Sequence, residues 1–129
     1  MYISPVERIK KIHIWIGKTS KSEEDYESYF DQEEEVSQFA TDIGLDSEYD
    51  EDFIGIIPLL TEEKPVSFVL KEETPIHPSE INFVENKCRE LGIESANAVF
   101  YLTDSSVVIN ESNLKYNDLY YIGIFDSSF

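Results

Sequence analysis

The sequence predicts an α+β fold, a mixed α/β sandwich in which helices pack on a mostly antiparallel or mixed sheet. Two observations lead to this prediction. Segments with the two-residue alternation of strands and segments with helical periodicity are both present, and they follow the order strand, helices, helix, strand and C-terminal strand. With 129 residues, of which 41% are apolar, the chain has the size and composition of a single domain over residues 1–129.

Three segments carry the pattern of strands. Residues 11–17, KIHIWIG, place their isoleucines on one face and His13 and Trp15 on the other, and Trp15 is expected to face the core or to be half-buried. Residues 97–102 are continuously apolar, which is typical of a central strand. Residues 118–125 predict a last strand with Tyr120, Ile122 and Ile124 on one face.

Three further segments are ambiguous. Residues 53–57 have strand composition, but Gly55 and Pro58 weaken this prediction. Residues 65–72 are interpreted as a strand rather than a helix because of their β-branched content. Residues 105–110 are a further candidate strand.

Three segments have the caps and periodicity of helices. Ser20 or Ser22 begins a first helix that extends to about residue 30. Ser37 caps a short second helix, and Gly44 ends it. Residues 79–92 predict the clearest helix, which begins at Ser79 and ends at a glycine, with an apolar stripe of Ile81, Val84, Cys88 and Leu91.

The net charge of −17 is concentrated in one part of the chain. Residues 20–63 contain 16 acidic residues and one Lys, whereas the remainder contains 11 acidic and 9 basic residues. Such a field repels phosphate groups, so nucleic acid and anionic membranes are not expected partners. A basic protein is the natural partner, and the alternative is that the charge serves solubility alone.

The densest acidic stretch contains six carboxylates between residues 42 and 52. Its alternating acids resemble the start of an EF-hand loop, but Glu51 occupies the required glycine position and Ile57 the required bidentate glutamate position. No specific calcium site and no cofactor are therefore predicted. A catalytic carboxylate pair is not favoured either, because adjacent acids in an exposed turn lack the contrast in burial that such a pair needs.

The rest of the chain offers little catalytic chemistry. His13 and His77 are far apart in sequence, and each is expected to be structural or on the surface. Cys88 is the single cysteine, so no intrachain disulfide can form, and a reduced, cytoplasmic setting is expected. The first residues lack the features of a signal peptide, and no apolar run approaches the roughly 20 residues of a membrane span.

Three pieces of the chain resemble the Imm22 type of bacterial immunity protein: HIWIG (13–17), SEEDYESYF (22–30) and SQFATDIGLDSEYDEDFIG (37–55). A later piece, ELGIESANAVFYL (90–102), is also similar, so the resemblance covers about residues 12–102. It implies a protein without enzymatic activity that binds and neutralises a cognate polymorphic toxin. Toxins of such systems are often nucleases, which are basic because they bind nucleic acid.

The acidic stretch is therefore the expected partner-binding surface for a basic toxin domain. Its expected residues are Asp42, Asp46, Glu48, Tyr49, Asp50, Glu51 and Asp52, with Tyr49 as an exposed aromatic contact. One alternative is an acidic cytosolic adaptor or nucleic-acid mimic that regulates another basic protein. Another is an enzyme with a pocket around His13, His77 or buried carboxylates. A homodimer through an edge strand at 118–125 is a further option.

Overall fold

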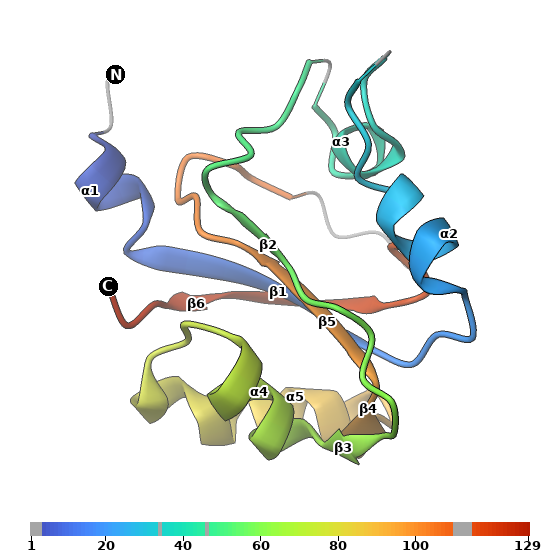
Figure 1. Cartoon of the computed structure of the whole chain (residues 1–129). Helices are drawn as coiled ribbons and strands as arrows, with labels where there is room; N and C mark the ends of the chain where they lie inside the picture. The colour runs from blue at the N-terminus through green and yellow to red at the C-terminus, as the bar shows by residue number, and fades with distance from the viewer. Residues whose placement is uncertain (1–3, 34, 46, 110–114) are drawn as a thin grey trace.

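The computed structural model describes residues 4–33, 35–45, 47–109 and 115–129, and it confirms the predicted α+β class. A four-stranded antiparallel sheet has the strand order β2-β5-β1-β6, and a two-stranded sheet pairs β3 with β4 (Figure 1). The strands are β1 (Lys11–Gly17), β2 (Ile54–Ile56), β3 (Lys64–Pro65), β4 (Ser95–Ala96), β5 (Ala98–Leu102) and β6 (Tyr120–Asp126). The helices are α1 (Pro5–Arg8), α2 (Glu23–Ser28), α3 (Gln38–Asp42), α4 (Val66–Glu73), the 3₁₀ helix η1 (Pro78–Glu80) and α5 (Ile81–Glu90).

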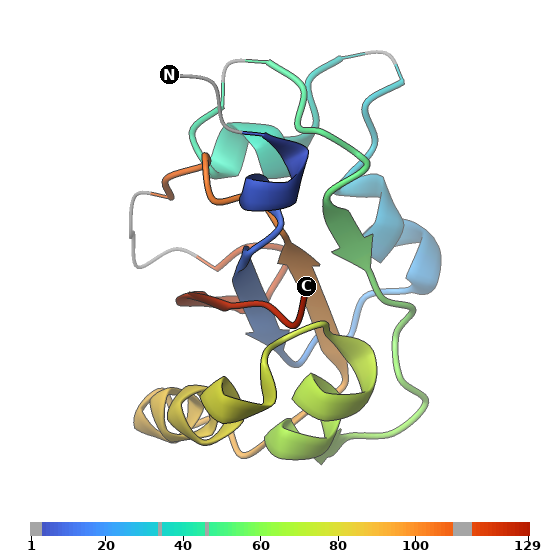
Figure 2. The same ribbon diagram turned by 90° about the vertical axis from the view of Figure 1, so that its left-hand side faces the viewer.

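Helices cover both faces of the large sheet. The pair α4 and α5 packs on one face, and α2 and α3 lie over the other, as the perpendicular view also shows (Figure 2). The alternation of β1 decides which residues enter which core. Ile12, Ile14 and Ile16 join the α4–α5 side, whereas Trp15 is fully buried in an aromatic cluster on the α2–α3 side. Both predictions for β1 are confirmed.

The first two helices that the sequence predicts, α2 and α3, have the expected N-terminal caps. Ser22 caps α2 by accepting a hydrogen bond from the Asp25 N–H, and Ser37 does the same for α3 through the Ala40 N–H. Gly44 and Gly92 follow α3 and α5 with φ of +89° and +80°, a region that glycine adopts at low cost. The third predicted helix begins differently, because the His77 ring caps η1 and α5 starts at Ile81.

The strands β5 and β6 lie where the sequence predicts them, but the side chains of β6 do not share one face as expected. The strand β5 lies between β2 and β1, as expected of a central strand. In β6 the register against β1 shifts between Ile14 and Trp15, and Gly123 has φ of +142°. This bulge breaks the expected alternation. Ile122 packs in the α4–α5 core, but Ile124 is 45% exposed, so the prediction of one shared face is wrong.

Two of the ambiguous segments do not form the strands that the sequence analysis expected. Residues 66–73 form the helix α4, not a strand, since Val66, Val69 and Leu70 recur at helical spacing and are all buried against the sheet. Tertiary packing here overrides the β propensity of valine. Residues 105–109 form no strand, and Asn110 lies outside the described residues.

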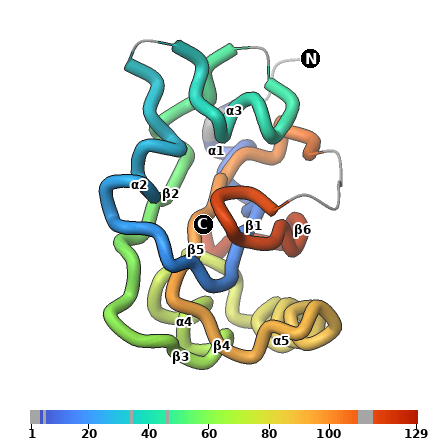
Figure 3. Tube along the Cα trace, turned by 90° about the vertical axis from the view of Figure 1, so that its right-hand side faces the viewer, coloured from blue at the N-terminus to red at the C-terminus, as the bar shows by residue number. Residues whose placement is uncertain are grey.

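Gly55 permits the strand β2 rather than preventing it. It pairs with Tyr101 of β5, and a side-chain Cβ at Gly55 would overlap the Tyr101 ring. The ring therefore covers the space that a side chain would occupy, an arrangement in which a cross-strand aromatic protects a strand glycine. Figure 3 shows β2 running beside β5.

Candidate functional site

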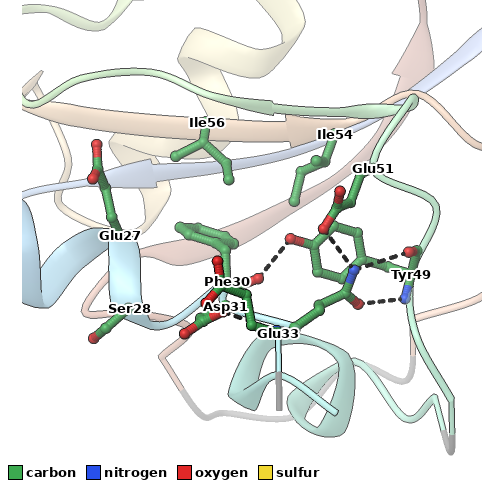
Figure 4. A pocket seen from close by; sticks show the side chains of 10 residues that line it. Glu27, Ser28, Phe30, Asp31, Glu33, Tyr49, Glu51, Ile54 and Ile56 are labelled. Carbon is green, nitrogen blue, oxygen red and sulfur yellow. Dashed lines mark hydrogen bonds between the residues drawn. The ribbon is translucent and has the colours of Figure 1, made fainter. Parts of the chain in front are cut away.

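An open depression of about 640 Å³ with several carboxylates in its lining lies beside α2 and β2. We call it the acidic groove, and its lining residues are Glu27, Ser28, Phe30, Asp31, Gln32, Glu33, Tyr49, Glu51, Ile54 and Ile56 (Figure 4). A neighbouring depression of about 480 Å³ shares Gln32 and Glu51 with it and continues to Glu48 and Asp50. Carboxylates therefore surround an apolar strip formed by Phe30 and the two isoleucines of β2.

The predicted partner-binding residues divide into three groups. Glu48, Asp50 and Glu51 line the two depressions, with Tyr49 between them. Asp42 and Asp52 are exposed outside them. Asp46 lies outside the described residues.

Asp42 has structural partners of its own on α3. Its carboxylate accepts hydrogen bonds from the Tyr29 hydroxyl at 2.6 Å and from the Gln38 side-chain amide at 2.8 Å. The first of these bonds ties α3 to the residue that follows α2. Asp42 therefore helps to join the helices α2 and α3, and a partner would contact a carboxylate that already accepts these two hydrogen bonds.

Tyr49 is not an exposed aromatic, and that prediction is wrong. Only 6% of its surface is accessible, and its ring meets Phe39 edge to face at 5.3 Å between centroids. Its hydroxyl donates to the Phe30 carbonyl at 2.7 Å. Burial, followed by the nearby charges of Glu51 and Asp31, raises the Tyr49 pKa to about 12. Tyr49 therefore fixes the acidic loop to the core and stays neutral at physiological pH.

Gln32 connects the two acidic walls of the groove. Its side-chain oxygen accepts the Tyr49 N–H at 2.8 Å, and its side-chain nitrogen donates to the Glu51 carboxylate at 3.1 Å. Figure 4 shows these bonds crossing from the segment after α2 to the segment before β2. The two segments are distant in sequence, and this amide fixes the Tyr49 main chain and the Glu51 carboxylate relative to the segment after α2.

Arg8 supports the far end of the acidic loop. Its guanidinium donates to both carboxylate oxygens of Asp104, at 3.1 and 2.6 Å, and lies 4.4 Å from the centre of the Phe53 ring. It also lies 3.8 Å from the Asp50 carboxylate. Burial disfavours ionised Asp104, but the hydrogen bonds from Arg8 and Ser106 outweigh it and hold the Asp104 pKa below its ordinary value.

The two histidines are structural, as expected, and neither lines the acidic groove. His13 is buried between the Tyr121 hydroxyl, 2.7 Å from Nδ1, and the Asp104 carbonyl, 3.1 Å from Nε2. His77 is exposed and caps η1. In the described part of the chain, no group of three or more His, Cys, Asp or Glu is arranged to hold a metal ion.

Sequence reasoning missed one wall of the groove. Glu27, Asp31 and Glu33 belong to it, but their acidic character alone does not distinguish them from the other charges of residues 20–63. Ile54 and Ile56 supply its apolar strip, whereas the sequence indicates for residues 53–57 only strand composition and packing on the core. Their proximity depends on long-range contacts that no local pattern carries.

Residues 12–127 match the protein family described as Immunity protein 22. The chain belongs to this family. Membership supports an immunity function and implies a toxin as the partner. In comparisons with curated proteins and with solved structures, nothing matches.

The match to Immunity protein 22 extends beyond the pieces that first suggested it. It continues past residue 102 to include β6, and it contains every residue that lines the acidic groove. The groove thus lies within the family's domain. In this Immunity protein 22 member, each helix of the described ranges is too short or too polar to cross a membrane.

Proposed function

We propose that this chain binds and neutralises a cognate, basic, nuclease-type toxin domain by electrostatic and steric blocking at the acidic groove. Membership of the Immunity protein 22 family carries the proposal, because it implies a toxin partner. The acidic walls supply the complementarity to a basic partner, since a surface that binds phosphates presents Lys and Arg side chains. Carboxylates in the groove would pair with those side chains in place of nucleic acid.

The groove suits such a role because the loop that carries part of its charge is held in place. Gln32 and the buried Tyr49 fix the loop that carries Glu51, while Glu27 extends from the helix α2. Pre-ordered carboxylates lose little conformational entropy on binding. Complementary charge raises the association rate, and burial of the apolar strip would slow dissociation. Fast capture matters for a nuclease that would otherwise act in the cell that produces it.

The proposed contact surface is the acidic groove together with Glu48 and Asp50. Tyr49 supports this surface from below and is not proposed as a direct contact. Asp42 and Asp52 are proposed at its periphery, and Asp46 remains part of the predicted set. We propose a cytoplasmic setting, with which the buried free thiol of Cys88 is consistent.

The proposal is tested by removing charge from the groove without disturbing the fold. Glu27→Gln and Glu33→Gln together remove two exposed carboxylates that line the groove. The matched control, Glu72→Gln with Glu90→Gln, removes two exposed carboxylates from α4 and α5. Association rates with the toxin domain encoded beside the gene are measured by stopped flow at several salt concentrations.

We expect the groove variant to associate several-fold more slowly at low salt and to depend less on salt than the wild type. The control is expected to depend on salt as the wild type does. Equal rates for the two double variants would contradict the role of the groove. Absence of any binding to the toxin domain would instead favour the adaptor hypothesis, in which an acidic protein regulates another basic protein.

A further inference from the structure

We propose that the toxin binds by adding an extended basic segment to the open edge of β2, so that the large sheet continues across the interface. This inference rests on the proposed function and specifies how the partner is held. It starts from the strand order β2-β5-β1-β6, which leaves β2 and β6 as the two edges of the sheet. The two edges differ in what their main-chain groups meet.

The main-chain groups of Ile54 and Ile56 point away from the sheet. The Thr103 N–H donates to the Phe53 carbonyl at 2.8 Å, so this pair at the end of the β2–β5 ladder is hydrogen-bonded. In antiparallel pairs, hydrogen-bonded and non-hydrogen-bonded positions alternate. Ile54 and Ile56, opposite Leu102 and Phe100, are therefore the non-bonded positions, with their N–H and C=O directed outward.

No other described residue occupies that edge by hydrogen bonding. Among the described ranges, the hydrogen bonds outside the ladder include none to the main chain of Ile54 or Ile56. The nearest such bonds lie beyond the two ends of β2: the Phe53 N–H donates to the Asp50 carbonyl at 3.0 Å, and the Leu59 N–H donates to the Glu23 carboxylate at 3.1 Å. The outward groups of β2 are thus available to an added strand.

The other edge strand of the sheet, β6, is better protected against strand addition than β2. In β6 the bulge near Gly123 interrupts the regular pairing surface, and the Lys87 ammonium group donates to the Ile122 carbonyl at 3.2 Å. Bulges and lysines are devices that prevent strand addition at a sheet edge. The strand that the sequence suggested for self-pairing is therefore the protected edge, and β2 is the better candidate for strand addition.

The acidic groove defines the chemistry of the added segment. The side chains of Ile54 and Ile56 line the same depression as the carboxylates of Glu27, Asp31 and Glu33 (Figure 4). A strand beside β2 would direct every second side chain toward this lining. The structure therefore favours a segment with Lys or Arg at positions facing the carboxylates. A second copy of this chain would bring like charges together, which disfavours self-pairing here.

Amide hydrogen exchange tests the inference directly. Exchange at Ile54 and Ile56 is measured by NMR in the free protein and in complex with a catalytically inactive form of the toxin domain encoded beside the gene. We expect both amides to exchange rapidly when free and at least about tenfold more slowly in the complex, because each gains a hydrogen bond. The Gly55 amide, which points toward β5, serves as the internal control and is expected to be protected in both states.

A pair of variants tests the same hydrogen bond by affinity. Ile56→Pro removes the outward N–H, which an edge strand tolerates, whereas Ile56→Ala shortens the side chain but keeps the N–H. We expect the proline variant to bind about tenfold more weakly than the alanine variant, as loss of one interfacial hydrogen bond predicts. Circular dichroism checks that both variants are folded.

The outcomes separate the inference from the proposed function. A complex in which Ile54 and Ile56 exchange as fast as in the free protein would overturn strand addition and leave the proposed toxin binding intact. Equal affinities of the folded proline and alanine variants for the toxin domain would also overturn strand addition and leave the proposed toxin binding intact. If no complex forms with the toxin domain, the proposed function fails, and this inference fails with it.

Discussion

The side-chain amide of Gln32 bonds both main-chain polar groups of Tyr49, 17 residues further along the chain. Its oxygen accepts from the Tyr49 N–H at 2.8 Å, and its nitrogen donates to the Tyr49 carbonyl at 3.3 Å. In effect, one side chain substitutes for a strand partner at the middle of the acidic loop. The order of the loop, and with it the position of Glu51, depends on this amide.

Substitution Gln32→Ala is expected to lower the free energy of unfolding by about 1–2 kcal/mol, because the partly buried Tyr49 main chain loses its partners. The Tyr49 amide should also exchange faster. Urea denaturation and hydrogen exchange measure the two effects. The control Gln38→Ala removes an exposed amide that bonds Asp42, and it should change stability by less than about 0.5 kcal/mol. Equal effects of both substitutions would show that Gln32 does not hold the loop.

Two buried tyrosines predict opposite responses to loss of a hydroxyl group. Tyr49→Phe leaves the Phe30 carbonyl without its 2.7 Å hydrogen bond and should destabilise the protein by about 1–2 kcal/mol. The Tyr26 hydroxyl is fully buried, and no described residue bonds it. Tyr26→Phe should therefore be neutral or stabilising by up to about 1 kcal/mol. Thermal or urea unfolding checks the order, and a reversed order would contradict the hydrogen-bond assignments.

The sequence allowed local features to be predicted, because each has a local cause. The faces of β1 follow from two-residue alternation, and the caps at Ser22 and Ser37 follow from side-chain oxygens placed before helical segments. The burial of Trp15 likewise follows from its place on a strand between two apolar residues. The α+β class could be inferred from the order of such segments alone.

Other features depend on contacts that sequence patterns do not contain. Valine content suggested a strand at residues 65–72, but packing on the sheet selects the helix α4. Tyr49 appeared to lie in a charged, exposed turn, yet the turn folds back so that its ring reaches Phe39. The candidate site was therefore predicted in part: its acidic loop was found, while the wall containing Glu27 was not.

Gly55 and Tyr101 make a further pair whose effects are coupled. Gly55→Ala should destabilise the protein by about 1–3 kcal/mol, because the new methyl group displaces the Tyr101 ring. In a Tyr101→Ala background that overlap is absent. The same Gly55→Ala substitution should then be neutral or stabilising, since alanine restricts the unfolded chain more than glycine does. A double-mutant cycle by urea denaturation measures this coupling, and simple additivity would rule it out.

His13 is expected to make stability depend on pH. Because a carbonyl oxygen can only accept, Nε2 carries the proton donated to Asp104, and the neutral ring accepts the Tyr121 hydroxyl at Nδ1. Burial lowers the His13 pKa from its ordinary value of 6.5, against the opposing effect of the hydrogen bond to Asp104. A second proton would reverse the bond to Tyr121 and place a charge in the core.

The direction of the pH effect follows from proton binding. Below about pH 6.5 the unfolded chain protonates this histidine before the folded chain does, so the free energy of unfolding falls as the pH decreases. The contribution is fully present above pH 6.5 and is lost as the pH falls toward the folded pKa. Because acid also relieves repulsion within a chain of net charge −17, the comparison must be between variants. His13→Gln should lose this component of the slope between about pH 5 and 6.5, whereas His77→Gln, at an exposed position, should retain it. Identical slopes for the wild type and His13→Gln in urea denaturation would show that His13 does not titrate in a buried site.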